Sequence, residues 1–174
     1  GIDEAECHGQ TVLVIHDETS DERCYLAVSD VLRAGVPEML EALRQAGIRH
    51  TIMLTGDNAH IAASIARQAG IDKVRAGLLP EDKVDAVKQL ATQYGAVAMI
   101  GDGVNDAPAL SAATVGVAMG LAGTDTALET ADVALMSDDL SRLPFLMRLS
   151  RRTLGIVRTN ITFALAVKAL FLIL

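Results

Sequence analysis

The stretch Met99-Ile100-Gly101-Asp102-Gly103-Val104-Asn105-Asp106-Ala107-Pro108-Ala109-Leu110 decides the fold of this chain. The apolar run over residues 96–100 predicts a buried strand, which the Gly-Asp-Gly turn ends. The two glycines allow a tight turn and a close approach of the backbone to a ligand. Pro108 suits the first turn of a helix that begins after Asp106. Asp102 and Asp106 are therefore expected at the carboxyl edge of an α/β sheet, where such sheets bind ligands.

The two carboxylates of this stretch point to a metal site. Asp102 and Asp106 supply hard oxygen donors on a loop, and such donors suit Mg²⁺ better than a soft metal. The alternative interpretation is a plain turn whose aspartates cap the next helix. The metal-site interpretation therefore depends on whether phosphate-binding residues accompany this loop elsewhere in the chain.

Length and composition favour one intracellular α/β domain. The chain has 174 residues, of which 51% are hydrophobic and 3% aromatic. That length allows a well-buried core, and the composition suits a sheet covered by helices on both faces. Cys7 and Cys24 fit no metal-ligand spacing and are interpreted as reduced thiols. The alternative is a metal role for Cys7 together with His8.

Charge is unevenly distributed along the chain. Residues 1–139 carry 9 Lys and Arg against 22 Asp and Glu, whereas residues 140–174 carry 6 basic residues and no acidic one. The acidic body makes nucleic acid an unexpected partner. The basic stretch running into an apolar tail favours the cytoplasmic surface of a lipid membrane.

The order of expected elements predicts a doubly wound parallel sheet. Strands are expected at 51–54, 96–100, 115–119 and 133–136, and helices at 37–45, 59–68, 80–94 and 124–131. Strands that alternate with helices are typical of parallel βαβ units. Two earlier strands, at 11–15 and 25–28, are expected to form a hairpin that need not join this sheet.

The last 35 residues follow another pattern. From Leu140 onward, leucines recur near helical spacing with arginines between them, and residues 161–174 are apolar apart mainly from Lys168. This pattern predicts a basic stalk helix that runs into a membrane helix, and the alternative is an amphipathic helix lying on the domain. The final apolar run of 14 residues is shorter than the ~20 needed to span a bilayer. Together with the absence of an initiator methionine, it predicts a fragment of a longer protein.

A second strand end completes a candidate phosphate site. Thr55-Gly56-Asp57 ends the expected strand at 51–54, and Lys83 stands near the start of a later helix. Phosphoryl oxygens could be positioned and their charge neutralised by the Thr55 hydroxyl, the Lys83 ammonium and a metal held by Asp102. The backbone N–H groups of Gly56 and Asp57 would add hydrogen-bond donors. The alternatives are helix capping by Thr55 or Asp57 and a solvated surface lysine at position 83.

These motifs resemble those of a known family. Thr55-Gly56-Asp57-Asn58 and residues 101–110 resemble signature motifs of the P-type ATPases, ion pumps whose phosphorylation domain has the haloacid dehalogenase fold. Further segments are similar to that family or to its heavy-metal (type IB) branch: Pro-Glu-Asp-Lys at 80–83, Asp-Val-Leu-Arg at 30–33, Gly-Thr-Asp at 123–125 and Glu-Thr-Ala-Asp at 129–132. The resemblance covers nearly the whole chain from about Gly9.

The resemblance implies roles around a magnesium ion. Asp102 would ligate the catalytic Mg²⁺, and Asn105 and Asp106 would complete its surroundings and support the phosphate. Thr55 and Lys83 would contact the phosphoryl oxygens. The cofactors implied are therefore Mg²⁺ and ATP.

The nucleotide is expected to touch the loop at the first strand end. Asp57 would help to bind ATP or shape the loop, beside the Gly56 backbone.

One departure from the family is large. The Asp-Lys-Thr-Gly-Thr motif with the phosphorylated aspartate is absent from this sequence, as are the Cys-Pro-Cys-type metal site and the Thr-Gly-Glu loop. The resemblance implies that these parts, with most of the nucleotide-binding domain, precede Gly1 as partners of this segment. The chain alone is expected to lack the first strand of its sheet, to hydrolyse no ATP and to form no phosphoenzyme.

The resemblance also divides the chain. Residues 1–29 would be the end of the nucleotide-binding domain and its return strands, residues 30–139 the phosphorylation domain, and residues 140–174 the stalk and a truncated transmembrane helix. The expected location is a multi-pass plasma or inner membrane protein with this domain in the cytoplasm.

Lys168 bears on the transported ion. A lysine within an apolar helix is a functional candidate by default, although snorkelling toward the interface is the alternative. Asn160 followed eight positions later by Lys168 resembles the exporters of Zn²⁺, Cd²⁺ and Pb²⁺, which implies a counter-charge near a divalent ion. Two rival functions remain open: a soluble haloacid dehalogenase-type phosphatase, and a non-catalytic remnant or regulatory module of a pump gene.

Overall fold

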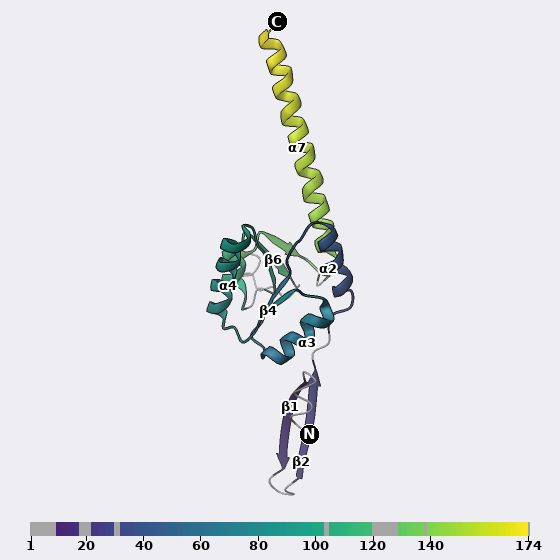
Figure 1. Ribbon diagram of the computed structural model, residues 1–174, viewed down its shortest axis with the longest axis vertical. Helices are drawn as coiled ribbons and strands as arrows, with labels where there is room; N and C mark the ends of the chain where they lie inside the picture. The colour runs from purple at the N-terminus through teal and green to yellow at the C-terminus, as the bar shows by residue number, and fades with distance from the viewer. Residues whose placement is uncertain are drawn as a thin grey trace.

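The computed structural model describes residues 10–17, 22–29, 32–102, 105–119, 129–137 and 139–173. An α/β body lies in the middle of the molecule, a hairpin extends from one end, and a long helix extends from the other (Figure 1).

The hairpin forms a sheet of its own, as the sequence predicts. β1 (Gln10–Asp17) pairs antiparallel with β2 (Glu22–Ser29), with Leu13 opposite Leu26. Both of these leucines are half exposed. The expected turn between the strands and Cys7 lie outside the described residues, whereas Cys24 is exposed on β2 with a free thiol.

The body contains parallel strands, but they form two sheets rather than the single sheet expected. β3 (Ile52–Leu54) pairs with β4 (Lys73–Arg75), and β5 (Ala98–Gly101), β6 (Val115–Met119) and β7 (Val133–Leu135) form the second sheet. The parallel pairing is confirmed. The described strands divide into two parallel sheets because no strand among them bridges β3 and β5. Sequence analysis also missed β4, whose Lys-Val-Arg sequence has no apolar run.

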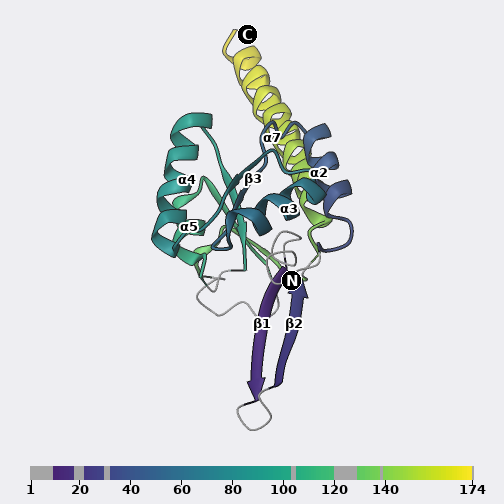
Figure 2. The ribbon, with the colours of Figure 1, turned by 60° about the horizontal axis from the view of Figure 1, so that its bottom comes forward.

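Helices cover the strands on two sides, as expected for βαβ units. α4 (Pro80–Tyr94) and α5 (Ala107–Ala112) lie together on one side, with α2 (Val36–Gln45) and α3 (Ala59–Ala69) on the other (Figure 2). The bounds lie within one residue of the expected ones for the first three helices in the chain. Of the helix expected at 124–131, only residues 129–131 are described, and residues 129 and 130 are helical.

The main core joins α2 to the strands and to the start of the last helix. Leu40 and Leu43 of α2 pack in one cluster with Val117 of β6, Leu135 of β7 and Leu143. Each of these side chains is at least nine-tenths buried. Burial of a large apolar side chain stabilises a fold by roughly 1.5–3 kcal/mol. This cluster therefore holds the base of the last helix firmly against the body.

That last helix, α7 (Arg142–Ile173), projects away from the body (Figure 1). Leu143 and Pro144 are buried at its base, but every residue from 148 to 173 is exposed. At 1.5 Å per residue its length is about 48 Å. The alternative of an amphipathic helix lying on the domain is therefore wrong.

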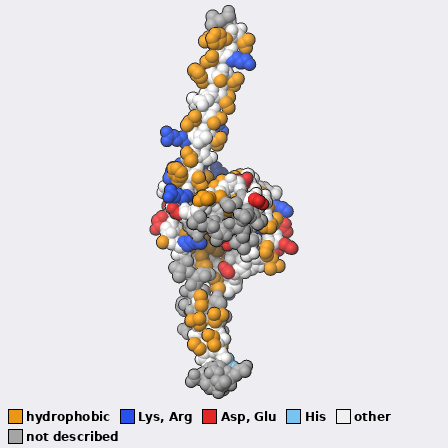
Figure 3. Space-filling view, turned by 180° about the vertical axis from the view of Figure 1, so that it is seen from behind, with side chains coloured by type: hydrophobic (Ala, Val, Ile, Leu, Met, Phe, Trp, Pro, Cys, Tyr) orange, Lys and Arg blue, Asp and Glu red, His pale blue; other side chains and the backbone are white. Residues whose placement is uncertain are grey.

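Within the part of the chain that the structure describes, α7 alone has the length and composition to cross a membrane. The apolar run expected from residue 161 is too short to span a bilayer, whereas the apolar part of α7 begins before that residue and is long enough. Apolar side chains lie along α7 and along the hairpin, acidic side chains lie on the body, and basic ones lie on the body and at intervals along α7 (Figure 3). These two projecting parts thus expose most of the large apolar side chains that lie on the surface of the described residues.

Candidate phosphate site at the carboxyl ends of the strands

The loop after β3 is closed by short-range hydrogen bonds. The Thr55 hydroxyl donates to Asp57 Oδ2 at 2.8 Å and accepts from the Asp57 N–H at 3.1 Å. The Asp57 carbonyl accepts from the Gly77 N–H at 2.8 Å, which ties this loop to the loop after β4. The Thr55 hydroxyl therefore lies at the carboxyl end of β3, as predicted, but its partner is Asp57. The Asp57 N–H expected to face a phosphate is used in this same pair.

The capping alternative for this loop is wrong. Asn58, not Thr55 or Asp57, accepts from the Ile61 N–H at 2.9 Å and caps α3. Gly56 is exposed, and a Cβ placed there would lie 3.3 Å from the Leu78 carbonyl oxygen. Asn58 therefore caps α3, and capping does not explain the Thr55 hydroxyl or the Asp57 carboxylate.

The loop after β5 is closed by a long-range ion pair. Lys83 Nζ, on the first turn of α4, lies 2.7 Å from Asp106 Oδ1, and the two side chains are only 15% and 16% exposed. The alternative of a solvated surface lysine is therefore wrong. Asp106 occupies the N-cap position of α5 without a side-chain capping bond, so capping does not explain this residue either. Removing both charges from water costs free energy, which a close pair offsets only with good geometry and further hydrogen bonds.

Gly101 allows Asp106 to take up this position. A Cβ built on Gly101 would lie 2.8 Å from Asp106 Oδ2 and 2.9 Å from Asp106 Cβ. Those distances are too short for any side chain, so the glycine is required by a close approach rather than by its backbone angles. The sequence predicted a tight turn and a close approach to a ligand at this glycine, but not its contact with Asp106.

Asp82 fixes the start of α4 and so positions Lys83. This role of Asp82 was not predicted from the sequence. Asp82 Oδ2 accepts from the Leu79 N–H at 3.0 Å and so fixes the start of α4. The Pro80 ring occupies the first helical position, where its missing N–H costs nothing. The acidic residue three positions after Leu79 was the available signal, because it completes the usual N-terminal capping arrangement.

Asp102 and Asn105 follow β5 and are exposed. Gly103 and Val104 between them lie outside the described residues. Within the described residues no group of three His, Cys, Asp or Glu side chains is placed to hold a metal ion. Asp102 and Asp106 nevertheless offer the hard carboxylate donors that Mg²⁺ accepts, and Mg²⁺ commonly keeps several waters. The donor set therefore fits a magnesium ion that takes its remaining ligands from water, phosphate or groups outside this chain.

A cavity of about 780 Å³ separates the two sheets. It is lined by Ile52 and Leu54 of β3, by Met99 and Ile100 of β5 and, near the carboxyl end of β5, by Asp106.

The amino end of β3 carries a separate polar cluster. Asp72 accepts from the Thr51 N–H at 2.8 Å and from the Thr51 hydroxyl at 2.9 Å. These bonds, with the nearby Arg44 guanidinium, hold the pKa of Asp72 below its ordinary value. The cluster lies at the end of the strands opposite to Thr55 and so stabilises the β3–β4 pair rather than the candidate site.

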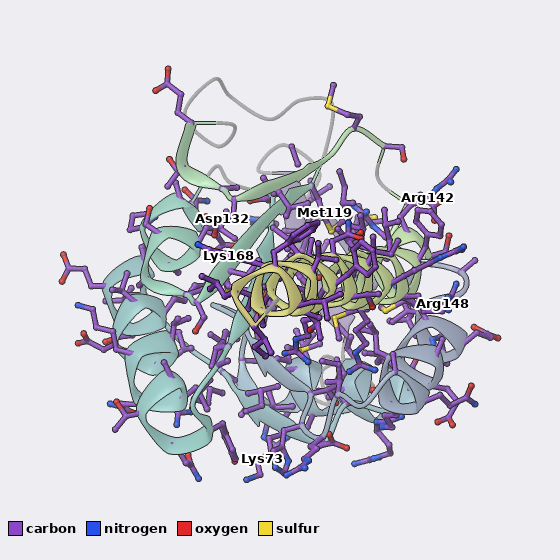
Figure 4. All side chains as sticks on the ribbon, turned by 90° about the horizontal axis from the view of Figure 1, so that it is seen from above. Lys73, Met119, Asp132, Arg142, Arg148 and Lys168 are labelled. Atoms are coloured by element: carbon purple, nitrogen blue, oxygen red, sulfur yellow. The ribbon has the colours of Figure 1, made fainter. Side chains whose placement is uncertain are left out.

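Lys168 does not join the site. It lies on α7, 26 positions after Arg142, which corresponds to about 39 Å along the helix. Figure 4 shows Lys168 near the projecting end of α7, with Arg142 and Arg148 closer to the body. The structure therefore groups Thr55 with Asp57 and Lys83 with Asp106, and it keeps the predicted counter-charge apart from both.

The chain is similar in sequence to known proteins. Residues 2–114 match the haloacid dehalogenase-like hydrolase family. The chain is 56% identical over 95% of its length to a probable cadmium-transporting ATPase of Alkalihalophilus pseudofirmus, of which it covers 23%. It is 46% identical over 94% of its length to a zinc-transporting ATPase of Bacillus subtilis, of which it covers 25%.

A solved structure extends the similarity to the fold. The crystal structure of a zinc-transporting PIB-type ATPase in the E2.Pi state matches with a TM-score of 0.85 and 46% identity, over 99% of this chain and 28% of that one. The chain thus spans about a quarter of the length of the proteins that it matches.

Proposed function

The chain belongs to the haloacid dehalogenase-like hydrolases, and from that membership we propose that it is the phosphorylation segment of an ATP-driven heavy-metal pump of the P type. The observation that carries the proposal is the Lys83–Asp106 pair, held at 2.7 Å in a largely buried position at the carboxyl end of β5. A lysine in that position places positive charge where a phosphoryl group would bring negative charge. The homology to metal-transporting P-type ATPases extends over 95% of the chain and supports the assignment.

In this proposal some residues of the chain bind the phosphoryl group, and others orient those residues or hold the metal ion. Lys83 donates hydrogen bonds to its oxygens while it stays paired with Asp106, and the Thr55 hydroxyl does so once it turns away from Asp57. Asp106 orients Lys83 through their ion pair. P-type ATPases and haloacid dehalogenase-like hydrolases use Mg²⁺ and ATP in general, and here Asp102 and Asp106 would hold the Mg²⁺, which neutralises phosphate charge.

The remaining predicted positions border this arrangement. Asn105 would support the phosphate from the loop after β5, and Gly56 and Asp57 would form the edge that meets the nucleotide. The nucleophilic aspartate belongs to the Asp-Lys-Thr-Gly-Thr motif that this sequence lacks. The chain by itself is therefore expected to form no phosphoenzyme.

A pump is favoured over a stand-alone phosphatase by α7. The similarity to the cadmium-transporting ATPase covers 166 residues and so includes most of this exposed, apolar helix. A soluble phosphatase has no need for a helix of about 48 Å that projects from its body. The partners proposed are accordingly a lipid membrane, the upstream domains of the same pump and a divalent metal ion.

The metal proposed is Zn²⁺, Cd²⁺ or Pb²⁺, with Lys168 as a counter-charge near the ion. Ten helical positions separate Lys168 from Arg158, which is about 15 Å. With Arg158 at the cytoplasmic interface, Lys168 would lie about halfway through a hydrocarbon core of roughly 30 Å. An ammonium at that depth repels a divalent cation and would favour its release.

A chimeric pump tests the proposal. These 174 residues replace the matching segment of the Bacillus subtilis zinc-transporting ATPase, and ³²P incorporation from ATP is measured with Zn²⁺ present. We expect an acid-stable phosphoenzyme from the chimera and none from the isolated chain. Labelling of the isolated chain, or an unlabelled but correctly folded chimera, would contradict the proposal.

The proposed role of Lys168 is tested in the same chimera. Lys168→Ala is expected to lower Zn²⁺-stimulated ATP hydrolysis, because a release step loses its counter-charge. Lys168→Arg keeps the charge and serves as the matched control. Unchanged hydrolysis and transport by Lys168→Ala would remove this role and leave the rest of the proposal intact.

A further inference from the structure

Basic side chains gather at the amino ends of β3 and β4, the end opposite to the candidate phosphate site. Arg49 lies in the loop before β3, and Lys73 is the first residue of β4. Because α3 connects these two parallel strands, its last turn, which carries Arg67, returns to the same end. All three residues are exposed. Asp72, an acidic side chain at this end, already forms an ion pair with Arg44 at 3.3 Å. This end of an otherwise acidic body is therefore basic.

Tyr94, the last residue of α4, fixes two side chains at this end. Lys73 Nζ donates to the Tyr94 hydroxyl at 3.0 Å, and the His50 ring packs on the Tyr94 ring with the two centroids 4.5 Å apart. An ammonium has three N–H donors, and the bond to Tyr94 uses one of them. The phenol is neutral at physiological pH. The bond therefore positions the Lys73 ammonium without cancelling its charge.

α7 leaves the body at this same end. A Cβ built on Gly47, in the loop between α2 and β3, would lie 3.0 Å from a guanidinium nitrogen of Arg151. Arg151 therefore lies beside the loop that also carries Arg49. Arg142, at the base of α7, precedes Arg151 by nine positions, or about 14 Å of helix. The rest of α7 projects beyond the amino ends of the strands (Figure 1).

The arginines of α7 that follow its base share one face of the helix. At 3.6 residues per turn they fall within about 120° of its circumference. Because Arg151 contacts the position of Gly47, this face is turned toward the loop before β3. No ion pair of these arginines occurs within the described residues. The arginine face of α7 consists of Arg148, Arg151, Arg152 and Arg158.

The position of α7 in a bilayer sets the height of this end above the lipid. With Arg158 at the cytoplasmic interface, as in the proposed function, Arg151 lies about 10 Å from the edge of the hydrocarbon core. The headgroup region fills roughly 5–7 Å of that distance. Charges also attract over a Debye length of about 8 Å at physiological ionic strength. The basic side chains beside Arg151 are therefore within reach of lipid headgroups.

We propose that the amino-end face of the body, formed by Arg49, Arg67 and Lys73, binds the headgroups of anionic phospholipids together with the arginine face of α7. Phosphate oxygens accept hydrogen bonds from guanidinium and ammonium groups, and an anionic leaflet attracts basic side chains at its surface. The phosphate site, at the other end of the strands, then faces away from the membrane. The inference rests on the proposed function for the membrane span, but not for phosphoryl transfer.

Hydrogen exchange tests this contact in the full 174-residue chain. The chain is reconstituted in nanodiscs of phosphatidylcholine, either alone or with about one-third phosphatidylglycerol, and amide exchange is followed by mass spectrometry. The reporter is the loop over residues 46–51, in which the Gly47 and Ile48 N–H groups are hydrogen-bonded. We expect phosphatidylglycerol to slow its exchange about threefold, and 1 M salt, where the Debye length is about 3 Å, to remove the effect.

The same experiment contains its own reference region. The loop over residues 55–58 lies at the carboxyl ends of the strands, and its Thr55 N–H is also hydrogen-bonded. Because this loop faces away from the proposed membrane surface, its exchange should be the same in both kinds of nanodisc. Slowing of both loops to the same extent would indicate a general stabilisation and would overturn the assignment to the amino-end face.

Three variants test the charge directly. A basic residue near an anionic surface favours contact about fivefold, so Arg49→Gln should reduce the slowing by phosphatidylglycerol from about threefold to below about twofold. Arg49→Lys keeps the charge and should keep the slowing. Arg23→Gln removes the same charge from the hairpin, at the opposite end of the molecule (Figure 1), and should also keep it. Far-UV circular dichroism checks that all three variants fold.

Two further outcomes would overturn the inference. Equal exchange of residues 46–51 in the two kinds of nanodisc would show that the body makes no lipid-specific contact. Equal slowing in Arg49→Gln and Arg23→Gln would show that the charge of this face is not what the lipid recognises.

The two proposals fail separately, because phosphoenzyme formation in the chimeric pump needs no comparison of lipids. An active chimera together with equal exchange in the two nanodiscs would remove the lipid contact and leave the pump assignment. An inactive chimera together with exchange that depends on phosphatidylglycerol would do the reverse.

Discussion

The loops after β3 and after β5 lie at the same end of parallel strands but are held in different ways. In the first, Thr55 and Asp57, two positions apart, share two hydrogen bonds at 2.8 and 3.1 Å. In the second, Lys83 and Asp106, 23 positions apart, form an ion pair at 2.7 Å. The first arrangement is local and partly exposed, whereas the second joins two helices and is largely buried.

The difference bears on how each loop responds to a ligand. Exposed hydrogen bonds exchange readily with water, so the Thr55 hydroxyl can turn from Asp57 to a phosphate at little cost. The Lys83–Asp106 pair cannot separate without leaving a poorly solvated charge, which is strongly unfavourable. The loop after β3 is thus suited to adapt, and the loop after β5 to stay in place.

The largest effect is expected from Lys83→Met in the chimeric pump. The variant removes the charge that the proposal places on the phosphoryl oxygens, and the rate of phosphoenzyme formation should fall about 100-fold or more. Single-turnover ³²P labelling measures this rate. Lys88→Met, at an exposed position of the same helix, is the control and should label within twofold of the chimera. Equal labelling by both variants would place the chemistry elsewhere.

Alanine substitutions at Gly101 and Gly56 test whether the loop after β5 is more rigid than the loop after β3. In Gly101→Ala the new methyl group would overlap Asp106, so the free energy of unfolding should fall by about 1–3 kcal/mol. In Gly56→Ala the nearest atom is 3.3 Å away, and the small clash is offset by a less flexible unfolded chain. Urea unfolding followed by circular dichroism measures both. Similar losses in the two variants would contradict the distinction between the loops.

Thr55→Val tests how much the hydrogen bonds between Thr55 and Asp57 contribute to stability. The valine has the shape of threonine without the hydroxyl, and the loss of its bonds with Asp57 should lower the free energy of unfolding by about 0.5–1.5 kcal/mol. Thr55→Ser keeps the hydroxyl and should differ little from the natural chain. A loss as large as that of Gly101→Ala would show that the loop after β3 is as tightly held as the other.

The smallest effect is expected at the amino end of β3. Because its bonds to Thr51 lower the pKa of Asp72 in the folded chain, this carboxylate adds stability above its unfolded pKa of about 4 and loses it as the pH falls through the folded pKa. The side chain is 38% exposed, so solvent screens the contribution to below about 1 kcal/mol. The difference in unfolding free energy between the natural chain and Asp72→Asn should therefore shrink from pH 7 to pH 3. A constant difference would contradict this assignment.

The sequence by itself determined the elements whose signals are local. Pro80 with two acidic residues marks the start of α4, and the apolar run before Gly101 marks β5, because propensity and capping act within a few residues. The order of these elements was enough to predict parallel βαβ units. The match to the haloacid dehalogenase-like hydrolases confirms that fold class.

The tertiary structure alone decided how the elements meet. The partner of Lys83, the contact between Gly101 and Asp106, the short strand β4 and the gap between β3 and β5 all depend on residues distant in the chain. Chain reversal and strand register set these distances, and no local pattern encodes them. The direction of α7 also depends on tertiary contacts, although its helical pattern was predicted from the sequence. Its projection from the body follows from the burial of Leu143 and Pro144 at its base.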